Sequence, residues 1–131
     1  MEETTRARDA VGAATIAQAF RIISVNRASD VAVRTKGDEL TWTWGELRER
    51  VDALAGGLAA LGLRRGDTVA LLLNTRPEFA VCDLAAMMAG ATPFSIYMQY
   101  TPEQIRFVVT DAGARFLITE QALLAGALEA R

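Results

Sequence analysis

The chain has 131 residues, of which 51% are hydrophobic and 23% are charged, and its formal net charge is −2 at pH 7. This composition is ordinary for a globular domain, and the charge gives no support to a nucleic-acid-binding surface, which needs clustered basic residues. The single cysteine and the absence of histidine exclude an internal disulfide and a cysteine-built metal site, and they argue against any zinc site. We interpret Cys82 as a small core residue.

The chain is predicted to hold one incomplete α/β domain at residues 15–131, preceded by a loose lead at residues 1–14. The acidic start has no apolar run typical of a secretory signal. Residues 84–102 carry no charge over nearly the length of a membrane span, but they contain Gly90 and Pro93 and change from a helical to a strand pattern. We therefore expect no transmembrane span and a cytoplasmic location.

A helix and a hairpin are predicted in the first third of the chain. Thr15-Ile-Ala-Gln18 is a capping-box pattern that opens a helix running to about Arg27. The residues expected on its buried face are Ile16, Phe20 and Ile23. Two short strands, at 31–35 and 39–43, are joined by Lys36-Gly37-Asp38 in a hairpin.

The next helix is predicted to be amphipathic. The capping box Thr43-Trp-Gly-Glu46 opens it and Gly62 stops it. Its expected buried face comprises Leu47, Val51, Leu54, Leu58 and Leu61. We interpret Gly56-Gly57 inside this helix as a site of close packing rather than a phosphate cradle. In the turn that follows, Gly66-Asp67, the aspartate is expected to cap a turn rather than to act as a base.

The centre of the chain has the pattern of a strand, a helix and a second strand. Thr68–Leu73 is a continuous apolar run, which is typical of a strand buried on both faces of a parallel sheet. Thr75-Arg-Pro-Glu78 is predicted to open a helix as a capping box with Pro77 in the first turn, and Gly90 to end it. Ala91–Tyr97 is the predicted second strand.

The helix at Phe79–Ala89 is apolar nearly all round. Such a helix is expected to be covered on two sides, and without a cover it would expose a large apolar patch. Asp83 is the exception on this helix. A buried carboxylate needs a partner, so we expect an arginine from elsewhere in the fold to pair with it.

The last third of the chain is predicted to add a helix, a strand and a helix. Thr101-Pro-Glu-Gln104 is a fourth capping box, and its helix ends near Gly113. The residues that this helix is expected to bury are Ile105, Val108 and Val109. Ala114–Thr119 is a third apolar strand, and Glu120–Arg131 a final helix. The alternation predicts an α/β fold with a partial doubly wound, mostly parallel sheet flanked by helices, and a short N-terminal hairpin.

The sequence carries no recognisable catalytic motif. It has no Gly-x-Ser-x-Gly elbow and no Gly-x-x-x-x-Gly-Lys phosphate loop, so no catalytic, cofactor-binding or metal-binding residue is assigned. One hypothesis is a small flavodoxin-like nucleotide-binding domain, since ligands collect at the carboxyl ends of such strands. There, Asn74-Thr75-Arg76 would offer helix N–H groups and one cation to an anion.

Four segments, taken together, carry a family resemblance. They are Leu40-Thr-Trp-Thr-Trp-Gly-Glu-Leu47, Gly62–Asn74, Arg76-Pro-Glu-Phe79, and Gly90-Ala-Thr-Pro-Phe-Ser-Ile-Tyr97 with Thr101-Pro-Glu-Gln104. In this order and spacing, over about residues 15–125, the chain resembles the N-terminal region of the adenylate-forming (AMP-binding) superfamily, most closely the long-chain fatty-acid–CoA ligases. Met98-Gln99-Tyr100 departs from the family pattern, which usually has proline and then small hydroxyl residues.

The resemblance implies a two-step reaction in which ATP and a fatty acid give an acyl-adenylate, and coenzyme A then displaces AMP. ATP, Mg²⁺ and CoA are implied for the full-length enzyme, but the phosphate loop and the catalytic lysine lie beyond the matched region, and Lys36 does not match that lysine. The matching residues, such as Thr43, Glu46, Gly66 and Asp67, belong to the scaffold.

We therefore predict an N-terminal ligase fragment that is inactive alone and works with the remainder of the ligase or a partner subunit. The alternative is a stand-alone interaction or dimerisation module derived from that scaffold.

Overall fold

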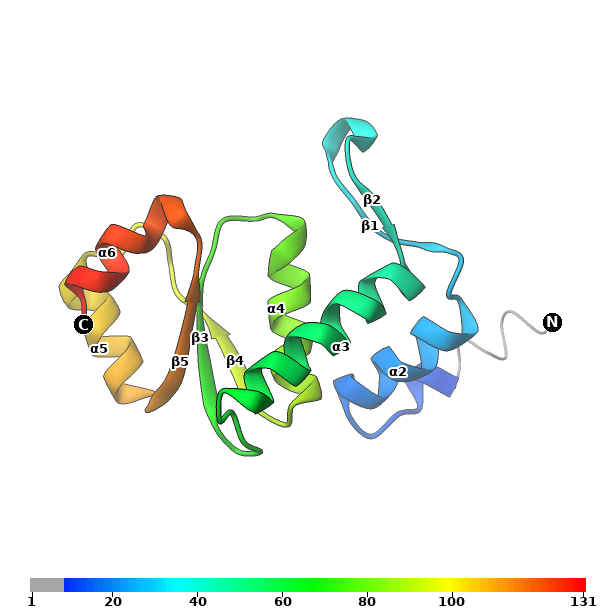
Figure 1. The fold of residues 1–131 in the computed structure, drawn as a ribbon, viewed down its shortest axis with the longest axis horizontal. Coiled ribbons are helices and arrows are strands. Elements are labelled where there is room, and N and C mark those ends of the chain that lie inside the picture. Colours follow the sequence, from blue (N-terminus) through cyan, green and yellow to red (C-terminus); the bar gives the residue numbers. More distant parts are fainter. Residues whose placement is uncertain (1–8) are drawn as a thin grey trace. The chain divides into compact units, whose positions relative to one another are not determined.

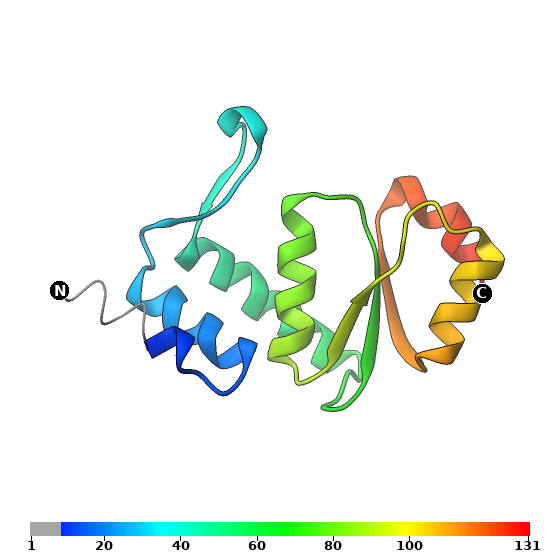
Figure 2. The same cartoon turned by 180° about the vertical axis from the view of Figure 1, so that it is seen from behind.

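The computed structural model of the chain describes residues 9–131 (Figures 1 and 2). The predicted absence of a secretory signal and most of the predicted lead concern residues 1–8, which lie outside the described residues. The chain divides into two compact units, one up to Ala53 and one from Leu54 onward. Within residues 9–131, no helix is both long enough and apolar enough to cross a membrane.

The first unit contains a helix, a hairpin and the start of a second helix. These are α2 (Ile16–Asn26), β1 (Val31–Arg34), β2 (Thr41–Thr43) and the first part of α3 (Trp44–Ala60). The two strands pair antiparallel, and a short 3-10 turn at Lys36–Asp38 joins them. The predicted hairpin is thus confirmed, with strands slightly shorter than expected.

Aromatic and aliphatic side chains form the interior of the first unit. Its buried hydrophobic residues are Phe20, Trp42, Leu47 and Val51. The rings of Phe20 and Trp44 lie 6.3 Å apart between centroids. Ile16, predicted to be buried, is instead 64% exposed. It is the first residue of α2, and side chains tilt toward the N-terminus of a helix, so its side chain projects past the helix end.

Three of the four predicted helix caps are confirmed. The hydroxyl of Thr15 accepts a hydrogen bond from the N–H of Gln18 at 3.1 Å. The capping boxes opened by Thr43 and Thr101 are complete. In each, the threonine hydroxyl accepts a hydrogen bond from the backbone N–H three residues later, and the side chain of that later residue accepts one from the backbone N–H of the threonine. These caps satisfy N–H groups that the first helical turn leaves without partners.

The fourth predicted cap, at Thr75, is wrong. Helix α4 (Pro77–Met88) has Arg76 as its N-cap, with extended backbone angles and no side-chain cap bond. Pro77 is the reason, because proline fits the first helical position and biases the residue before it toward an extended conformation. Glu78 therefore binds Arg76 instead of closing a capping box on Thr75.

The second unit is built on a three-stranded parallel sheet. Its strand order is β4 (Thr92–Ser95), β3 (Thr68–Leu72) and β5 (Ala114–Thr119). The chain leaves β3 for β4 on one side and then returns to β5 on the other. A reversal of this kind is the doubly wound arrangement that the sequence predicts.

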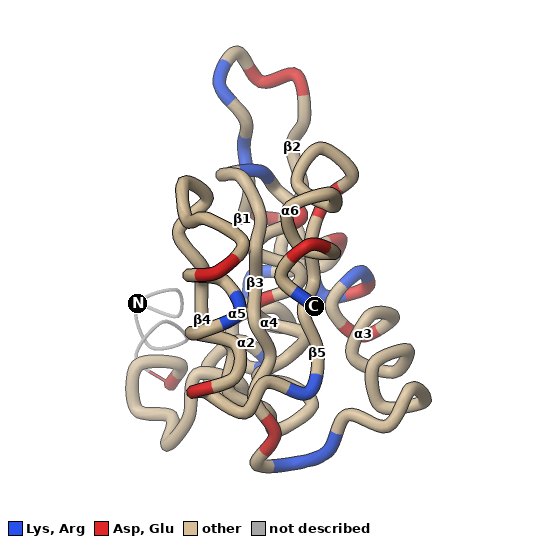
Figure 3. The backbone as a smooth tube through the Cα atoms, turned by 90° about the vertical axis from the view of Figure 1, so that its left-hand side faces the viewer, with Lys and Arg blue, Asp and Glu red and all other residues tan. Residues whose placement is uncertain are grey.

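Helices lie on both faces of this sheet (Figures 1 and 2). Helix α4 lies on one face, and α5 (Pro102–Asp111) with α6 (Leu124–Glu129) lies on the other. The buried cluster on the second face comprises Ala70, Leu72, Ile96, Ile105 and Ala130. The central strand β3 carries no charged residue (Figure 3). The fold is therefore the expected α/β layering around a central strand buried from both sides.

Two helices end in the same motif with glycine. After α3, the N–H of Leu63 donates to the carbonyl of Leu58 at 2.9 Å while Gly62 adopts a φ of 103°. This Schellman motif buries Leu63 against the last turn of the helix and turns Leu61 outward, where it is 73% exposed. The prediction that Leu61 is buried is therefore wrong. Gly90 ends α4 in the same way, with a φ of 81°.

Two predictions about packing have different outcomes. Gly56 and Gly57 are exposed, and a Cβ added at either position would meet no atom within 4 Å, so the predicted close packing is wrong. By contrast, every residue from Phe79 to Ala89 is buried or half-buried. The helix that the sequence marks as apolar all round is therefore covered, as expected.

The Thr101 cap leads to a stability prediction. Replacing Thr101 by alanine removes the oxygen that accepts the N–H of Gln104, so we expect the free energy of unfolding to fall by about 1 kcal/mol. Urea denaturation followed by circular dichroism measures the change. The matched control is Thr75→Ala, which removes an exposed threonine that caps nothing and should leave the midpoint unchanged. Equal losses in the two variants would contradict the assignment of the caps.

Candidate functional site

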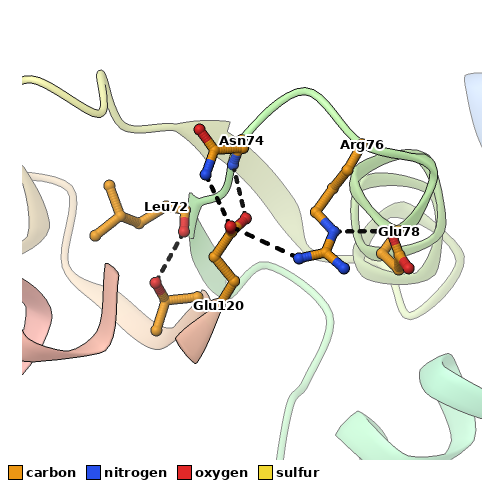
Figure 4. A network of polar contacts seen from close by, with 6 residues as sticks. Leu72, Asn74, Arg76, Glu78 and Glu120 are labelled. Carbon is orange, nitrogen blue, oxygen red and sulfur yellow. Dashed lines mark hydrogen bonds and ion pairs between the residues drawn. The ribbon is translucent and has the colours of Figure 1, made fainter. Parts of the chain in front are cut away.

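Polar side chains from three elements meet where β3 and β5 end (Figure 4). The carboxylate of Glu120, just after β5, accepts hydrogen bonds from the backbone N–H of Asn74 at 2.9 Å and from its side-chain Nδ2 at 2.7 Å. The guanidinium of Arg76 lies 3.6 Å from the same carboxylate. Glu120 thus joins the loop after β3 to the end of β5. We call Asn74, Arg76, Glu78 and Glu120 the Glu120 cluster.

Two further contacts hold this edge of the sheet. Nε of Arg76 donates to the carboxylate of Glu78 at 2.8 Å, which directs the guanidinium along the first turn of α4. The hydroxyl of Thr119 donates to the carbonyl of Leu72 at 2.9 Å, at the last residue of β3. The start of α4 and the ends of both strands are therefore connected by charge-assisted and neutral hydrogen bonds.

The electrostatics of the cluster favour its charged form. The hydrogen bonds from Asn74 lower the pKa of Glu120 below its ordinary value of 4.5, and the charge of Arg76 adds to the effect. The hydrogen bond from Arg76 likewise lowers the pKa of Glu78. In return, Glu78 and then Glu120 raise the pKa of Arg76. Both carboxylates therefore stay ionised at neutral pH, and the pKa values move away from those that suit proton transfer.

The cluster does not have the properties of an anion-binding site. The cation expected to face a phosphate, Arg76, is already bound to the carboxylates of Glu78 and Glu120, and the backbone N–H of Asn74 is bound to Glu120. Two carboxylates against one guanidinium also leave a negative local charge, which repels a phosphate. The geometry therefore does not support the hypothesis of a flavodoxin-like nucleotide site at Asn74-Thr75-Arg76.

The other residues that the sequence singled out are dispersed. Asp67 accepts the backbone N–H of Arg64 at 2.8 Å and so holds the turn before β3, as expected. Cys82 is buried on α4, and burial raises the pKa of its thiol, which suits a core residue and not a nucleophile. Asp83 is half-buried, and burial raises the pKa of its carboxyl. The expected arginine partner of Asp83 is absent among the described residues, so that prediction is wrong for this part of the chain.

The described residues, 9–131, offer no fitting site for the phosphates or the metal implied by the resemblance. Lys36 lies in the short turn of the hairpin. In residues 9–131, no group of three or more aspartate, glutamate, cysteine or histidine side chains is placed to hold a metal ion. Thr43 and Glu46 cap α3, and Asp67 closes a turn, so the residues that match the family pattern serve as scaffold.

Sequence reasoning missed the role of Glu120. The sequence predicts Glu120 as the first residue of a final helix, whereas in the structure it lies between β5 and a 3-10 turn at Gln121–Leu123 and binds Asn74, 46 positions earlier. The available signal was its place directly after an apolar strand. The carboxyl ends of neighbouring parallel strands meet at one edge of a sheet, so polar residues there are brought together.

Comparison with known proteins gives relatives of two kinds. An uncharacterised protein of Mycobacterium tuberculosis H37Rv is 42% identical over 107 residues, which are 82% of this chain and 61% of that protein. The acetyl-coenzyme A synthetase of Gemmatimonas aurantiaca is 34% identical over 94 residues, which are 72% of this chain and 14% of the synthetase. The chain therefore spans less than two thirds of the length of either relative.

Solved structures also match most of this chain but only a small part of their own length. A benzoate CoA ligase from Burkholderia xenovorans LB400 superposes with a TM-score of 0.76 at 28% identity, over 85% of this chain and 22% of the ligase. The N-terminal subdomain of Klebsiella oxytoca NpsA, in complex with anthranilyl-AMSN, superposes with a TM-score of 0.73 at 33% identity, over 78% of this chain and 26% of that chain.

The family profile described as AMP-binding enzyme matches residues 22–131. This match covers most of the chain and includes every strand of the parallel sheet as well as the hairpin. By sequence and by fold, the chain belongs to the AMP-binding enzyme family.

Proposed function

We propose that the chain is the N-terminal part of a fatty-acid–CoA ligase and that residues 15–131 form a subdomain of its AMP-binding domain. The whole enzyme would convert ATP and a fatty acid to an acyl-adenylate and then to an acyl-CoA, in the cytoplasm, with Mg²⁺ and CoA held by parts outside this chain. The observation that carries the proposal is the family match over residues 22–131. The choice of a fatty acid is supported by the stretch Gly90–Tyr97, which resembles long-chain acyl ligases.

The chemistry of the described residues supports a scaffold role. An adenylating enzyme needs donors aimed at the developing charge of the phosphates and a metal to offset that charge. Here the strongest donors at the edge of the sheet are bound to carboxylates within the Glu120 cluster. The polar groups of this chain therefore serve to fix its own loops, and the proposal assigns catalysis to the remainder of the enzyme.

A second candidate is a stand-alone module that binds another polypeptide. The observation in its favour is that the mycobacterial relative is much shorter than the synthetase. The 107 matched residues make up 61% of the mycobacterial protein, whereas the 94 matched residues make up only 14% of the synthetase. Light scattering on the purified chain distinguishes the two. A discrete dimer or partner complex favours the module, and heterogeneous aggregation favours a fragment that lacks its remainder.

The proposal predicts that the chain alone does not adenylate fatty acids. In an ATP–pyrophosphate exchange assay with palmitate, we expect no exchange above the background without enzyme, because neither a phosphate loop nor a metal site is present among residues 9–131. The benzoate CoA ligase with benzoate is the positive control for the assay. Exchange above background by the chain with palmitate would overturn the scaffold role.

A structural role for the Glu120 cluster predicts a pH-dependent effect of Glu120→Gln. The amide keeps only one accepting oxygen for the two N–H groups of Asn74 and loses the charge facing Arg76, so we expect lower stability at neutral pH. The pKa of Glu120 is lowered on folding, so its stabilisation is complete above the ordinary value of 4.5 and is lost as the pH falls through the folded pKa. The difference between wild type and variant should shrink in that acidic range.

Urea denaturation at a series of pH values measures this difference. The matched control is Glu49→Gln, which changes an exposed glutamate on α3 that has no bonding partner in the described part of the chain. This control should leave the stability unchanged at every pH. A loss that stays constant from neutral to acidic pH would contradict the assigned ionisation of Glu120.

A further inference from the structure

Helix α3 belongs to both compact units of the chain. It runs without interruption from Trp44 to Ala60 (Figure 1), and the boundary between the units lies inside it, after Ala53. A helix that is shared in this way connects two units only as firmly as its own backbone stays helical. The residues that follow the boundary therefore decide how rigid the connection is.

The first part of α3 is fixed within the first unit. The backbone N–H of Gly45 donates to the carbonyl of Ala28 at 2.9 Å. Nη1 of Arg48 donates to the hydroxyl of Ser24 on α2 at 3.1 Å. Val51 has no exposed surface. Hydrogen bonds and burial thus hold this part of the helix to α2 and to the segment that follows α2.

The last part of α3 is fixed within the second unit. Leu58 is buried, and Leu63 folds back to donate its N–H to the carbonyl of Leu58 at 2.9 Å. In the turn that follows, the N–H of Gly66 donates to the carbonyl of Gly90, at the end of α4, at 3.0 Å. The helix is therefore anchored at both ends, and each anchor lies within its own unit.

The part of α3 between these anchors has few contacts to hold it. No residue from Asp52 to Gly57 is fully buried, and Gly56 and Gly57 are both exposed. A Cβ added at either glycine would meet no neighbouring atom within 4 Å, so close packing does not explain why side chains are missing there. Each glycine in an exposed helix interior disfavours the helix by about fivefold relative to alanine, because its backbone loses more freedom.

We propose that Gly56 and Gly57 form a hinge in α3, at which the helix opens and allows the first unit to change its orientation relative to the second. Pairs of small residues are among the few places at which helices bend sharply, and hinges are a few positions that absorb a change in backbone angles. Opening breaks the hydrogen bonds from the N–H groups of residues 58–60 to the carbonyls four positions earlier. The inference goes beyond the proposed function and does not depend on it.

Opening at this place leaves the rest of the chain intact. With no side chains at Gly56 and Gly57, water reaches the backbone there and replaces the hydrogen bonds that the helix loses. Val51 and Leu58 remain buried in their own units. The strands of the parallel sheet all follow the hinge along the chain, so their pairing is kept.

Residual dipolar couplings, measured by NMR on the whole chain, test the hinge because they report the alignment of each unit separately. In the wild type, we expect residues 16–51 and residues 58–131 to need different alignment tensors. In the double variant Gly56→Ala/Gly57→Ala, we expect this difference to be lost, so that one tensor fits both units. An added methyl group has room at both positions, so the variant keeps the fold.

Amide hydrogen exchange on the same two proteins locates the opening. The N–H groups of residues 58–60 should exchange about tenfold more slowly or better in the double variant, because alanine disfavours the open helix. The N–H groups of β3 should slow by much less, since they exchange only when the whole second unit unfolds.

The matched control is Gly126→Ala. Gly126 also lies inside a helix of the second unit, and a Cβ added there would meet no neighbouring atom within 4 Å. The substitution therefore gives α6 the same gain in helix preference without touching α3. It should leave the difference between the two alignment tensors as it is in the wild type.

Four outcomes would overturn the proposal. The first is a single alignment tensor that fits both units of the wild type. The second is a difference between the tensors that persists in the double variant, which would make the glycines a weak point of the helix without any reorientation. The third is exchange at residues 58–60 that does not slow in the double variant. The fourth is loss of the difference in Gly126→Ala, which would show that the effect does not depend on α3.

Discussion

The structure depends on the burial of β3 from both faces. Val69, Ala70 and Leu71 have no exposed surface, and the strand carries no charge. A strand of this kind is stable only if helices cover both faces and other strands satisfy the backbone on both sides. Helix α4 on one face, helices α5 and α6 on the other, and the flanking strands β4 and β5 meet these needs. The reversal of the chain around β3 is thus a consequence of burying one uncharged strand.

The same constraint determines where polar groups lie in the second unit. Because β3 is apolar from Val69 to Leu72, its polar contacts are displaced to the turns at its ends. Asp67 closes the turn before the strand, and Asn74 begins the loop after it. The first contact is local and the second reaches across to Glu120 on the neighbouring strand. The polar residues that border the buried strand therefore fix the geometry of the sheet, which explains why residues that sequence inspection singles out as candidates prove to be structural.

Local patterns were predictable from the sequence, and contacts between distant segments were not. The pattern of threonine followed three positions later by glutamate or glutamine correctly marks helix starts at Thr15, Thr43 and Thr101. It fails at Thr75, where Pro77 takes the first helical position and moves the cap to Arg76. At Thr101 the proline follows directly, so the capping pattern and the proline agree. Proline therefore supports the threonine cap when it follows the threonine directly, and it moves the cap by one residue when it stands one position later.

The missed features share a physical cause. A period of three or four residues places Ile16 and Leu61 on the apolar faces of their helices. The pattern does not show at which residue other elements of the fold cease to cover such a face, and both side chains prove to be exposed. Glu120 and Asn74 are 46 positions apart, and no local pattern couples them. Their meeting follows from the strand order, which the sequence predicts only as a class of fold and not as a register.

The polar side chains at the ends of the strands are bound to one another, whereas, among the described residues, the backbone at the outer edge of β5 is not. The carboxylates and amides at the ends of the strands are bound to one another, so they have little to offer a substrate. The backbone of Leu117 and Thr119, with the exposed leucines of α6 beside it, is by contrast a surface with unsatisfied apolar and hydrogen-bonding capacity. A chain whose polar side chains are bound to one another in this way has the properties of a scaffold, in keeping with its membership of the AMP-binding enzyme family.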